Sequence, residues 1–307
     1  MNGMKIHPEY VNLYSIMKPC PIVVENYGAT NQLLRSLIFA KEASAGRTPP
    51  FSNNLEGRTM TPEEKFVFDL QGYIIIKNVL TKAEVEEINQ ISDQIFPRDY
   101  NKKDNNQGLS LRRTANVSKW DPACQRLIDH PKVTPYLKEL LGPTFRLDHD
   151  YCIFMNRGEL EGNLHGGPET ANGCQFYKYH NGTMQNGLSV LTFFFADAGP
   201  NHGGFICVPG SHKSNFLSNM PSDVRELKRG EPYVMQPVAK AGDALFFTEA
   251  LIHGTAPWNA DHERRTFLYK YSPGHISFSQ TYYKIEDYFN PTDQQRRILS
   301  PPSVRGK

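Results

Sequence analysis

The hydrophobic pattern of the chain changes character near residue 145. Before this point, apolar residues recur at helical spacing behind two capping boxes, Thr61–Glu64 and Thr81–Glu84. A β-branched, apolar run lies between these two segments and is typical of a buried strand. The predicted helices cover residues 61–71, 81–95, 121–128 and 132–141, and the predicted strand covers residues 73–80.

After residue 145, short apolar runs alternate with turns rich in glycine, proline and asparagine. Helices followed by strands indicate a β-rich, α+β domain in which the N-terminal helices pack on one core. Six or more short strands with turn signals favour a double-stranded β-helix, the jelly-roll or cupin-like arrangement. The predicted strands cover residues 145–155, 188–197, 204–208, 233–238, 243–248 and 265–272.

The same pattern predicts the domain organisation. We expect a single domain over residues 61–290, with helical support from residues 61–142 and a barrel core over residues 145–275. Residues 1–60 are expected to form an N-terminal arm of undefined role, and residues 291–307 a C-terminal tail.

Composition and charge narrow the classes of function. The formal net charge is +2 and no run of Lys or Arg exceeds two residues, so we expect no nucleic-acid partner. No apolar run approaches the roughly 18 residues of a membrane span, and the N-terminus carries no signal-peptide pattern. Five scattered cysteines favour a reducing, cytoplasmic location over a disulfide framework. We therefore expect a small-molecule substrate; the sequence does not predict an oligomeric state.

Two histidines, His165 and His253, are candidates for metal binding. Each follows a strand-like stretch and has a glycine beside it, which allows close approach of backbone or a ligand. In a jelly roll, strands distant in sequence lie side by side, so the two imidazoles can share one ion. Two imidazoles, a carboxylate and open positions are typical of non-haem Fe(II). We interpret a further set of histidines as surface or structural residues: His7, His130, His180, His212, His262 and His275.

Two adjacent arginines, Arg264 and Arg265, begin the last predicted strand. Only one of two neighbouring strand residues can face the barrel interior. An inward guanidinium in an apolar barrel needs a carboxylate partner, which it can bind in bidentate fashion. A surface pair beside Asp261 and Glu263 is the alternative, and the residues alone leave both interpretations open.

Over roughly residues 60–275, a set of segments occurs in a consistent order: residues 72–81, 209–213, 241–247 and 253–255, followed by the two arginines. Together these segments resemble the phytanoyl-CoA dioxygenase family of Fe(II)- and 2-oxoglutarate-dependent oxygenases. This resemblance implies a double-stranded β-helix core, a His-x-Asp/Glu…His iron triad and an arginine that binds the far carboxylate of 2-oxoglutarate. By this resemblance His165 and His253 bind iron, Arg264, or alternatively Arg265, binds 2-oxoglutarate, and Thr255 places a hydroxyl near the same carboxylate.

The sequence departs from the family pattern at Gly167, where an iron-binding Asp or Glu is expected. One explanation is that another acid binds the iron, with Glu169 nearest and Asp148, Asp150 and Glu249 more remote. A second is a truly vacant position open to chloride, as in the iron-dependent halogenases of this superfamily. A third is that the fold has lost its metal and serves binding or structure alone.

The function predicted from the sequence is a hydroxylase-type oxygenase that uses Fe(II), 2-oxoglutarate and O2 on a small organic substrate. The alternatives are a halogenase that binds chloride at the position vacated by Gly167, and a catalytically inactive jelly-roll binding protein. Tyr177, Tyr179 and the polar loop 98–118 are candidates for substrate contact from their position alone.

Overall fold

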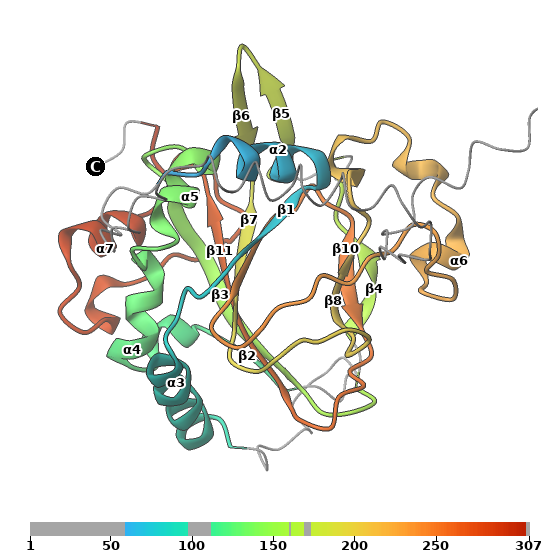
Figure 1. The fold of residues 1–307 in the computed structure, drawn as a ribbon. Coiled ribbons are helices and arrows are strands. Elements are labelled where there is room, and N and C mark those ends of the chain that lie inside the picture. Colours follow the sequence, from blue (N-terminus) through green and yellow to red (C-terminus); the bar gives the residue numbers. More distant parts are fainter. Residues whose placement is uncertain (1–58, 98–111, 160, 169–172, 305–307) are drawn as a thin grey trace, which may run out of the picture. The chain divides into compact units, whose positions relative to one another are not determined.

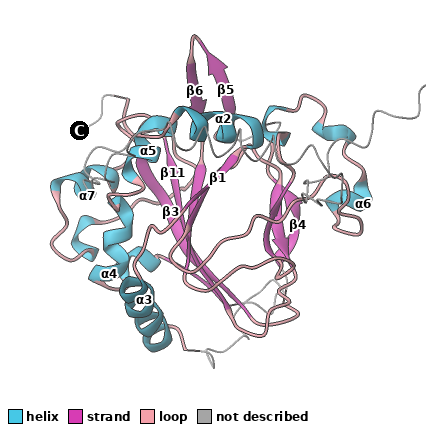
Figure 2. Cartoon of the chain, in the orientation of Figure 1, coloured by secondary structure: helices cyan, strands magenta, loops and turns pink. Residues whose placement is uncertain are grey.

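The computed structural model describes residues 59–97, 112–159, 161–168 and 173–304. The predicted N-terminal arm, most of the polar loop 98–118 and the candidate ligand Glu169 lie outside these residues. The described part is β-rich, with antiparallel sheets and helices packed against them (Figure 1; Figure 2). None of its helices has the length and apolar content needed to span a bilayer.

The larger sheet has six strands in the order β1-β9-β7-β11-β3-β2, and each pair of adjacent strands is antiparallel. A second sheet has three strands in the order β4-β10-β8, and β5 and β6 form a separate hairpin. The strands of the larger sheet are β1 (Tyr73–Ile76), β2 (Arg112–Ala115), β3 (Arg146–Met155), β7 (Ser189–Phe194), β9 (Ala244–Thr248) and β11 (Arg264–Ser272). The others are β4 (Glu161–His165), β5 (Tyr177–His180), β6 (Thr183–Asn186), β8 (Gly204–Cys207) and β10 (His253–Ala256).

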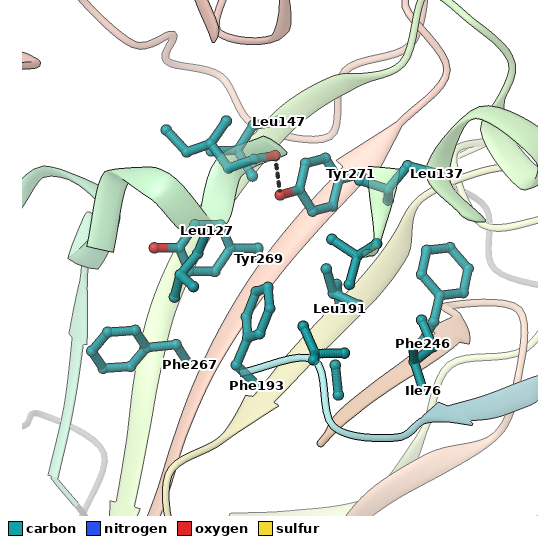
Figure 3. Close-up of a cluster of buried hydrophobic side chains, with 14 of the residues drawn as sticks. Ile76, Leu127, Leu137, Leu147, Leu191, Phe193, Phe246, Phe267, Tyr269 and Tyr271 are labelled. Carbon is teal, nitrogen blue, oxygen red and sulfur yellow. Dashed lines mark hydrogen bonds between the residues drawn. The ribbon is translucent and has the colours of Figure 1, made fainter. Parts of the chain in front are cut away.

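Helices cover the face of the six-stranded sheet that points away from the three-stranded sheet (Figure 1). Alternate residues of β11, among them Phe267, Tyr269 and Tyr271, enter this helix-side core (Figure 3). The buried phenol of Tyr271 donates to the main-chain oxygen of Ile128 at 2.8 Å, which ties the helical layer to the sheet. The helices of this layer are α2 (Pro62–Gln71), α3 (Lys82–Ile95), α4 (Pro122–Gln125), α5 (Thr134–Leu141) and α7 (Asp293–Ile298). The short helix α6 (Ser222–Arg225) lies instead beside β4 of the three-stranded sheet (Figure 1).

The opposite face of the six-stranded sheet packs against the three-stranded sheet. Residues such as Ile153, Phe247 and Leu268 from the larger sheet share one buried cluster with Phe205 and Cys207 of β8. Because side chains alternate along a strand, each strand of the larger sheet supplies one set of residues to the helices and another to the space between the sheets.

The N-terminal elements follow the sequence expectation closely. Both predicted capping boxes are present, and α2 ends where Gly72 adopts the left-handed conformation with φ 83°. The predicted helix 121–128 is a short α-helix continued by a 3₁₀ turn over Arg126–Asp129.

Two expectations need correction. The strand predicted over residues 233–238 does not form; Met235 only bridges Cys207, because Pro237 has no N–H with which to extend the ladder. The segment predicted as a C-terminal tail contains α7, whose Ile298 is fully buried in the helix-side core together with Leu299. Residues 291–304 are therefore part of the packed domain.

Candidate metal centre

His165 and His253 face each other across two neighbouring strands. His165 ends β4 and His253 begins β10, and the antiparallel register pairs their Cα atoms directly. Their imidazole ring centroids are 4.4 Å apart. Residues far apart in the sequence thus meet at one end of two neighbouring strands of the three-stranded sheet.

Hydrogen bonds to the main chain define which nitrogen each imidazole presents. Nδ1 of His253 lies 2.7 Å from the oxygen of Leu251, and Nδ1 of His165 lies 3.0 Å from the oxygen of Asn163. A carbonyl oxygen can only accept, so Nδ1 carries a proton in both rings, and in the neutral form of each ring Nε2 has the lone pair. This tautomer is the one that binds a metal through Nε2.

His253 is held in the neutral form that metal binding requires. Its side chain is buried against the rings of Phe205 and Phe247. Burial lowers the pKa of His253 to about 4, and the nearby carboxylate of Glu249 only partly opposes this effect. A neutral imidazole does not have to lose a proton before it binds a cation.

The two histidines line a cavity of about 410 Å³ between the sheets. Apolar side chains of Ile153, Phe205, Phe247 and Leu268 form much of its wall. The remaining lining residues include Arg113, Tyr151, Asn163, Thr192, Thr255, Arg264 and Lys270. The volume lies within the roughly 300–1,000 Å³ typical of small-molecule sites.

The two adjacent arginines point to opposite faces of β11. Arg264 lines the histidine cavity and is buried. Arg265 lies on the helix side, where its guanidinium pairs with Glu263 at 2.7 Å and Asp93 at 2.5 Å. Strand alternation thus leaves Arg264 as the member of the pair that can meet a carboxylate beside the histidines.

A buried acid lies next to the histidines. Oε1 of Glu249, the residue that follows β9, is 3.9 Å from Nε2 of His253 and 2.8 Å from Nζ of Lys270. Gln175 donates to the other carboxylate oxygen at 3.1 Å. Burial alone would raise the pKa of Glu249, but Lys270 and the imidazole of His253 lower it to about 2, so the carboxylate is ionised.

The other acids named in the sequence analysis are placed elsewhere or not described. Asp148 pairs with Arg146 at 2.7 Å and accepts from the main chain of Phe278 and Ser279. Asp150 accepts from the main chain and hydroxyl of Ser118. Within residues 59–97, 112–159, 161–168 and 173–304, no three His, Cys, Asp or Glu side chains form a ready-made metal cluster. The described site is therefore two imidazoles with one carboxylate close by.

Gly167 is not a simple loss of the expected acid from an unchanged backbone. Gly166 and Gly167 have φ values of 87° and 109°, which L side chains rarely adopt. A Cβ built at Gly167 would lie 2.9 Å from Leu217 and 3.1 Å from Ile252, in the apolar cluster beside β4. A side chain at this position would therefore begin away from the imidazole nitrogens.

We expect that Gly167→Asp does not strengthen metal binding. The substitution would cost about 1–3 kcal/mol of stability through backbone strain, and the contact with Leu217 adds to it. Gly182→Asp is a matched control, because Gly182 also has a positive φ of 79° but nothing within 4 Å of its added Cβ. Thermal unfolding and Co(II) titration of both variants check the prediction, and a Gly167→Asp protein that binds Co(II) more tightly than wild type would contradict it.

The structure does not bring the two candidate substrate tyrosines to the histidines. Tyr177 and Tyr179 line a separate cavity with residues of α2, and Tyr177 hydrogen-bonds Asp69 there. His212 has the structural role expected of it: it is buried and its Nε2 bonds the main-chain oxygen of Asp69 at 3.1 Å.

Comparison with known proteins identifies the family. A sequence model described as "Phytanoyl-CoA dioxygenase (PhyH)" matches residues 68–266. The chain belongs to the phytanoyl-CoA dioxygenase family. The resemblance drawn from the sequence motifs is thereby confirmed. No curated protein sequence matches the chain significantly.

Solved structures similar to this PhyH-family chain include enzymes that bind 2-oxoglutarate. HygX from Streptomyces hygroscopicus, with nickel and 2-oxoglutarate bound, has a TM-score of 0.63 at 22% identity over 71% of this chain and 89% of HygX. HygX with nickel, 2-oxoglutarate and hygromycin B bound gives 0.61 at 23% identity over the same shares. SnoK, a non-heme alpha ketoglutarate dependent carbocyclase from nogalamycin biosynthesis, gives 0.54 at 16% identity over 81% of this chain and 93% of SnoK. At these identities the likeness establishes a shared fold.

Proposed function

We propose that this protein is a non-haem Fe(II)- and 2-oxoglutarate-dependent oxygenase that hydroxylates a small organic substrate. The observation that carries the proposal is the pairing of two Nε2-presenting imidazoles with Arg264 in one cavity. In this proposal the facing sheets are the two halves of a double-stranded β-helix, and a cytoplasmic location is consistent with the free state of the four described cysteines.

The donor set fits Fe(II). His165 and His253 supply two imidazole nitrogens, and a carboxylate lies 3.9 Å from the second. Two imidazoles and a carboxylate that leave open positions are the ligand set of non-haem Fe(II) oxygenases. When bound together, Fe(II) and 2-oxoglutarate supply an oxidant from O2 with release of succinate and CO2.

The protein's own residues bind and orient the co-substrate. Arg264, which lines the cavity, would bind the far carboxylate of 2-oxoglutarate through charge-assisted hydrogen bonds. Thr255 on β10 adds a hydroxyl to the same carboxylate. The apolar wall of Phe205, Phe247 and Leu268 keeps water away, which strengthens each of these interactions.

The structure weighs against a purely structural role for the two histidines. An inactive binding protein would be expected to have imidazoles that point apart or no anionic group near them. Instead the rings are 4.4 Å apart and Glu249 lies beside them. Glu249 also supplies a carboxylate close to the histidines, as an oxygenase requires. A halogenase would have no such carboxylate, because chloride takes that position.

Anaerobic titration with Fe(II) and 2-oxoglutarate tests the proposal. We expect a weak visible charge-transfer band that requires both components and does not form with Zn(II), whose d¹⁰ shell cannot give this transition. Absence of the band at saturating Fe(II) would refute the oxygenase. A band that shifts on addition of chloride would instead support the halogenase.

A further inference from the structure

The site has two imidazoles and no acid at position 167, so the origin of a third protein ligand is open. We propose that Glu249 supplies the metal-binding carboxylate in place of the acid missing at Gly167. This inference rests on the proposed function, since it concerns the same metal. Glu249 directly follows β9 of the six-stranded sheet, in the turn that leads to β10, and is four residues before His253.

The two glycines after His165 allow the Glu249 segment to approach the site. The N–H of Gly167 donates to the main-chain oxygen of Glu249 at 3.2 Å. A Cβ at Gly166 would lie 2.9 Å from that same oxygen and 2.7 Å from the oxygen of Leu251. The two glycines therefore carry no acidic side chain themselves, and they allow the backbone of another acid, Glu249, to lie beside the histidines.

The turn from β9 to β10 fixes the start of the Glu249 side chain. The N–H of Glu249 donates to the oxygen of Leu188 at 2.9 Å, and the N–H of Leu251 donates to the oxygen of Thr248 at 2.9 Å. The backbone of Glu249 is therefore hydrogen-bonded on both sides, to Leu188 just before β7 and to Gly167 in the turn after His165. A ligand held by such a backbone needs little ordering when the ion binds.

The distance between Glu249 and His253 suits two ligands of one ion. Zinc binds imidazole nitrogen at about 2.0–2.1 Å and carboxylate oxygen at about 2.0–2.2 Å, so two such ligands of one ion lie about 3 Å apart when they are at right angles and at most about 4.3 Å apart when they face each other across the ion. Oε1 of Glu249 and Nε2 of His253 are 3.9 Å apart. Glu249 is also only 2% exposed, so its carboxylate has little contact with solvent.

Lys270 positions this carboxylate and offsets its charge. Its Nζ lies 2.8 Å from Oε1, and Gln175 holds the other oxygen at 3.1 Å. A carboxylate oxygen has two lone pairs, so Oε1 can accept from Lys270 and still bind a cation. Because the ammonium and a metal ion attract the same oxygen, Lys270 weakens metal binding even though it holds the carboxylate in place.

Three variants separate these roles: Glu249→Gln, Lys270→Met, and the double variant. Isothermal titration with Co(II) alone, under anaerobic conditions, measures affinity independently of turnover, and the visible spectrum of bound Co(II) reports the ligand set. We expect Glu249→Gln to lose at least about 100-fold in Co(II) affinity, beyond the 10–100-fold typical of outer-shell changes. Lys270→Met should bind Co(II) as tightly as wild type or more tightly.

The double variant is the control for loss of folding. Glu249→Gln alone leaves the buried ammonium of Lys270 unpaired, whereas the double variant removes both charges and should keep the wild-type unfolding midpoint. We expect it to lose Co(II) affinity as the single glutamate variant does. If both folded variants bind Co(II) like wild type, Glu249 is only the counter-ion of Lys270 and the inference is wrong. If wild type itself binds no metal, the proposed function fails instead.

Discussion

Replacing His253 with alanine should abolish both metal binding and turnover of 2-oxoglutarate. Nε2 of His253 is one of the two imidazole nitrogens that would bind the metal. The hydrogen bond from Nδ1 to the main-chain oxygen of Leu251 orients the ring so that Nε2 faces the cavity. We expect Fe(II) affinity to fall by at least about 100-fold, which exceeds the loss seen when only an outer-shell partner of a ligand is removed. Anaerobic titration that follows the Fe(II)–2-oxoglutarate band measures the effect.

The control variants separate ligation from folding. His253 packs against two aromatic rings, so alanine also leaves a cavity in the wall. His253→Gln keeps most of the side-chain volume and should restore the unfolding midpoint without restoring the band. His180→Ala, at an exposed position on β5, should leave the band unchanged. A His253→Gln protein with wild-type Fe(II) affinity would show that this imidazole is not a ligand.

The helical half of the fold is predictable because its signals are local. The capping boxes at Thr61 and Thr81 and the glycine at position 72 act within a few residues, and the structure has all three. The strand predicted over 233–238 fails for the opposite reason. Apolar, β-branched residues are present there, but a strand also needs a partner with which every N–H can pair, and Pro237 prevents this.

The edge strand β2 was missed because its sequence carries no strand pattern. Arg112-Arg-Thr-Ala has no apolar alternation. The segment pairs with β3, and the buried guanidinium of Arg112 is compensated by Glu263 at 2.5 Å. An ion pair between residues 151 positions apart is not visible in a single sequence.

Some residues of the candidate site are likewise predictable from local sequence, and others are not. Strand alternation along β11 was sufficient to predict that only one of Arg264 and Arg265 faces inward, and the same alternation places Leu268 and Lys270 on the side of Arg264. Lys270 was therefore within reach of the sequence argument but was missed. Glu249 is only one of three remote candidate acids in the sequence, because its approach to the histidines depends on two glycine conformations and on a turn between different sheets.

A second large effect is expected on 2-oxoglutarate binding, when Arg264 and its neighbour Arg265 are replaced in turn. We expect Arg264→Ala to raise the dissociation constant for 2-oxoglutarate strongly while Fe(II) still binds. Truncating one partner of a buried, hydrogen-bonded charge pair costs about 2–5 kcal/mol, which corresponds to between roughly 30-fold and several thousand-fold in affinity. Arg264→Lys should recover only part of this loss, since an ammonium cannot bind the carboxylate in bidentate fashion.

Arg265→Ala should have the reverse profile. It removes ion pairs with Glu263 and Asp93 on the helix side and touches nothing in the histidine cavity. The loss of stability should be somewhat below the roughly 3–5 kcal/mol of a broken buried pair, because Glu263 keeps its contact with Arg112. Affinity for 2-oxoglutarate, measured by anaerobic titration below the unfolding temperature, should stay near wild type. If Arg265→Ala lost the co-substrate and Arg264→Ala kept it, the assignment of the two faces of β11 would have to be exchanged, and with it the proposed orientation of 2-oxoglutarate between the sheets.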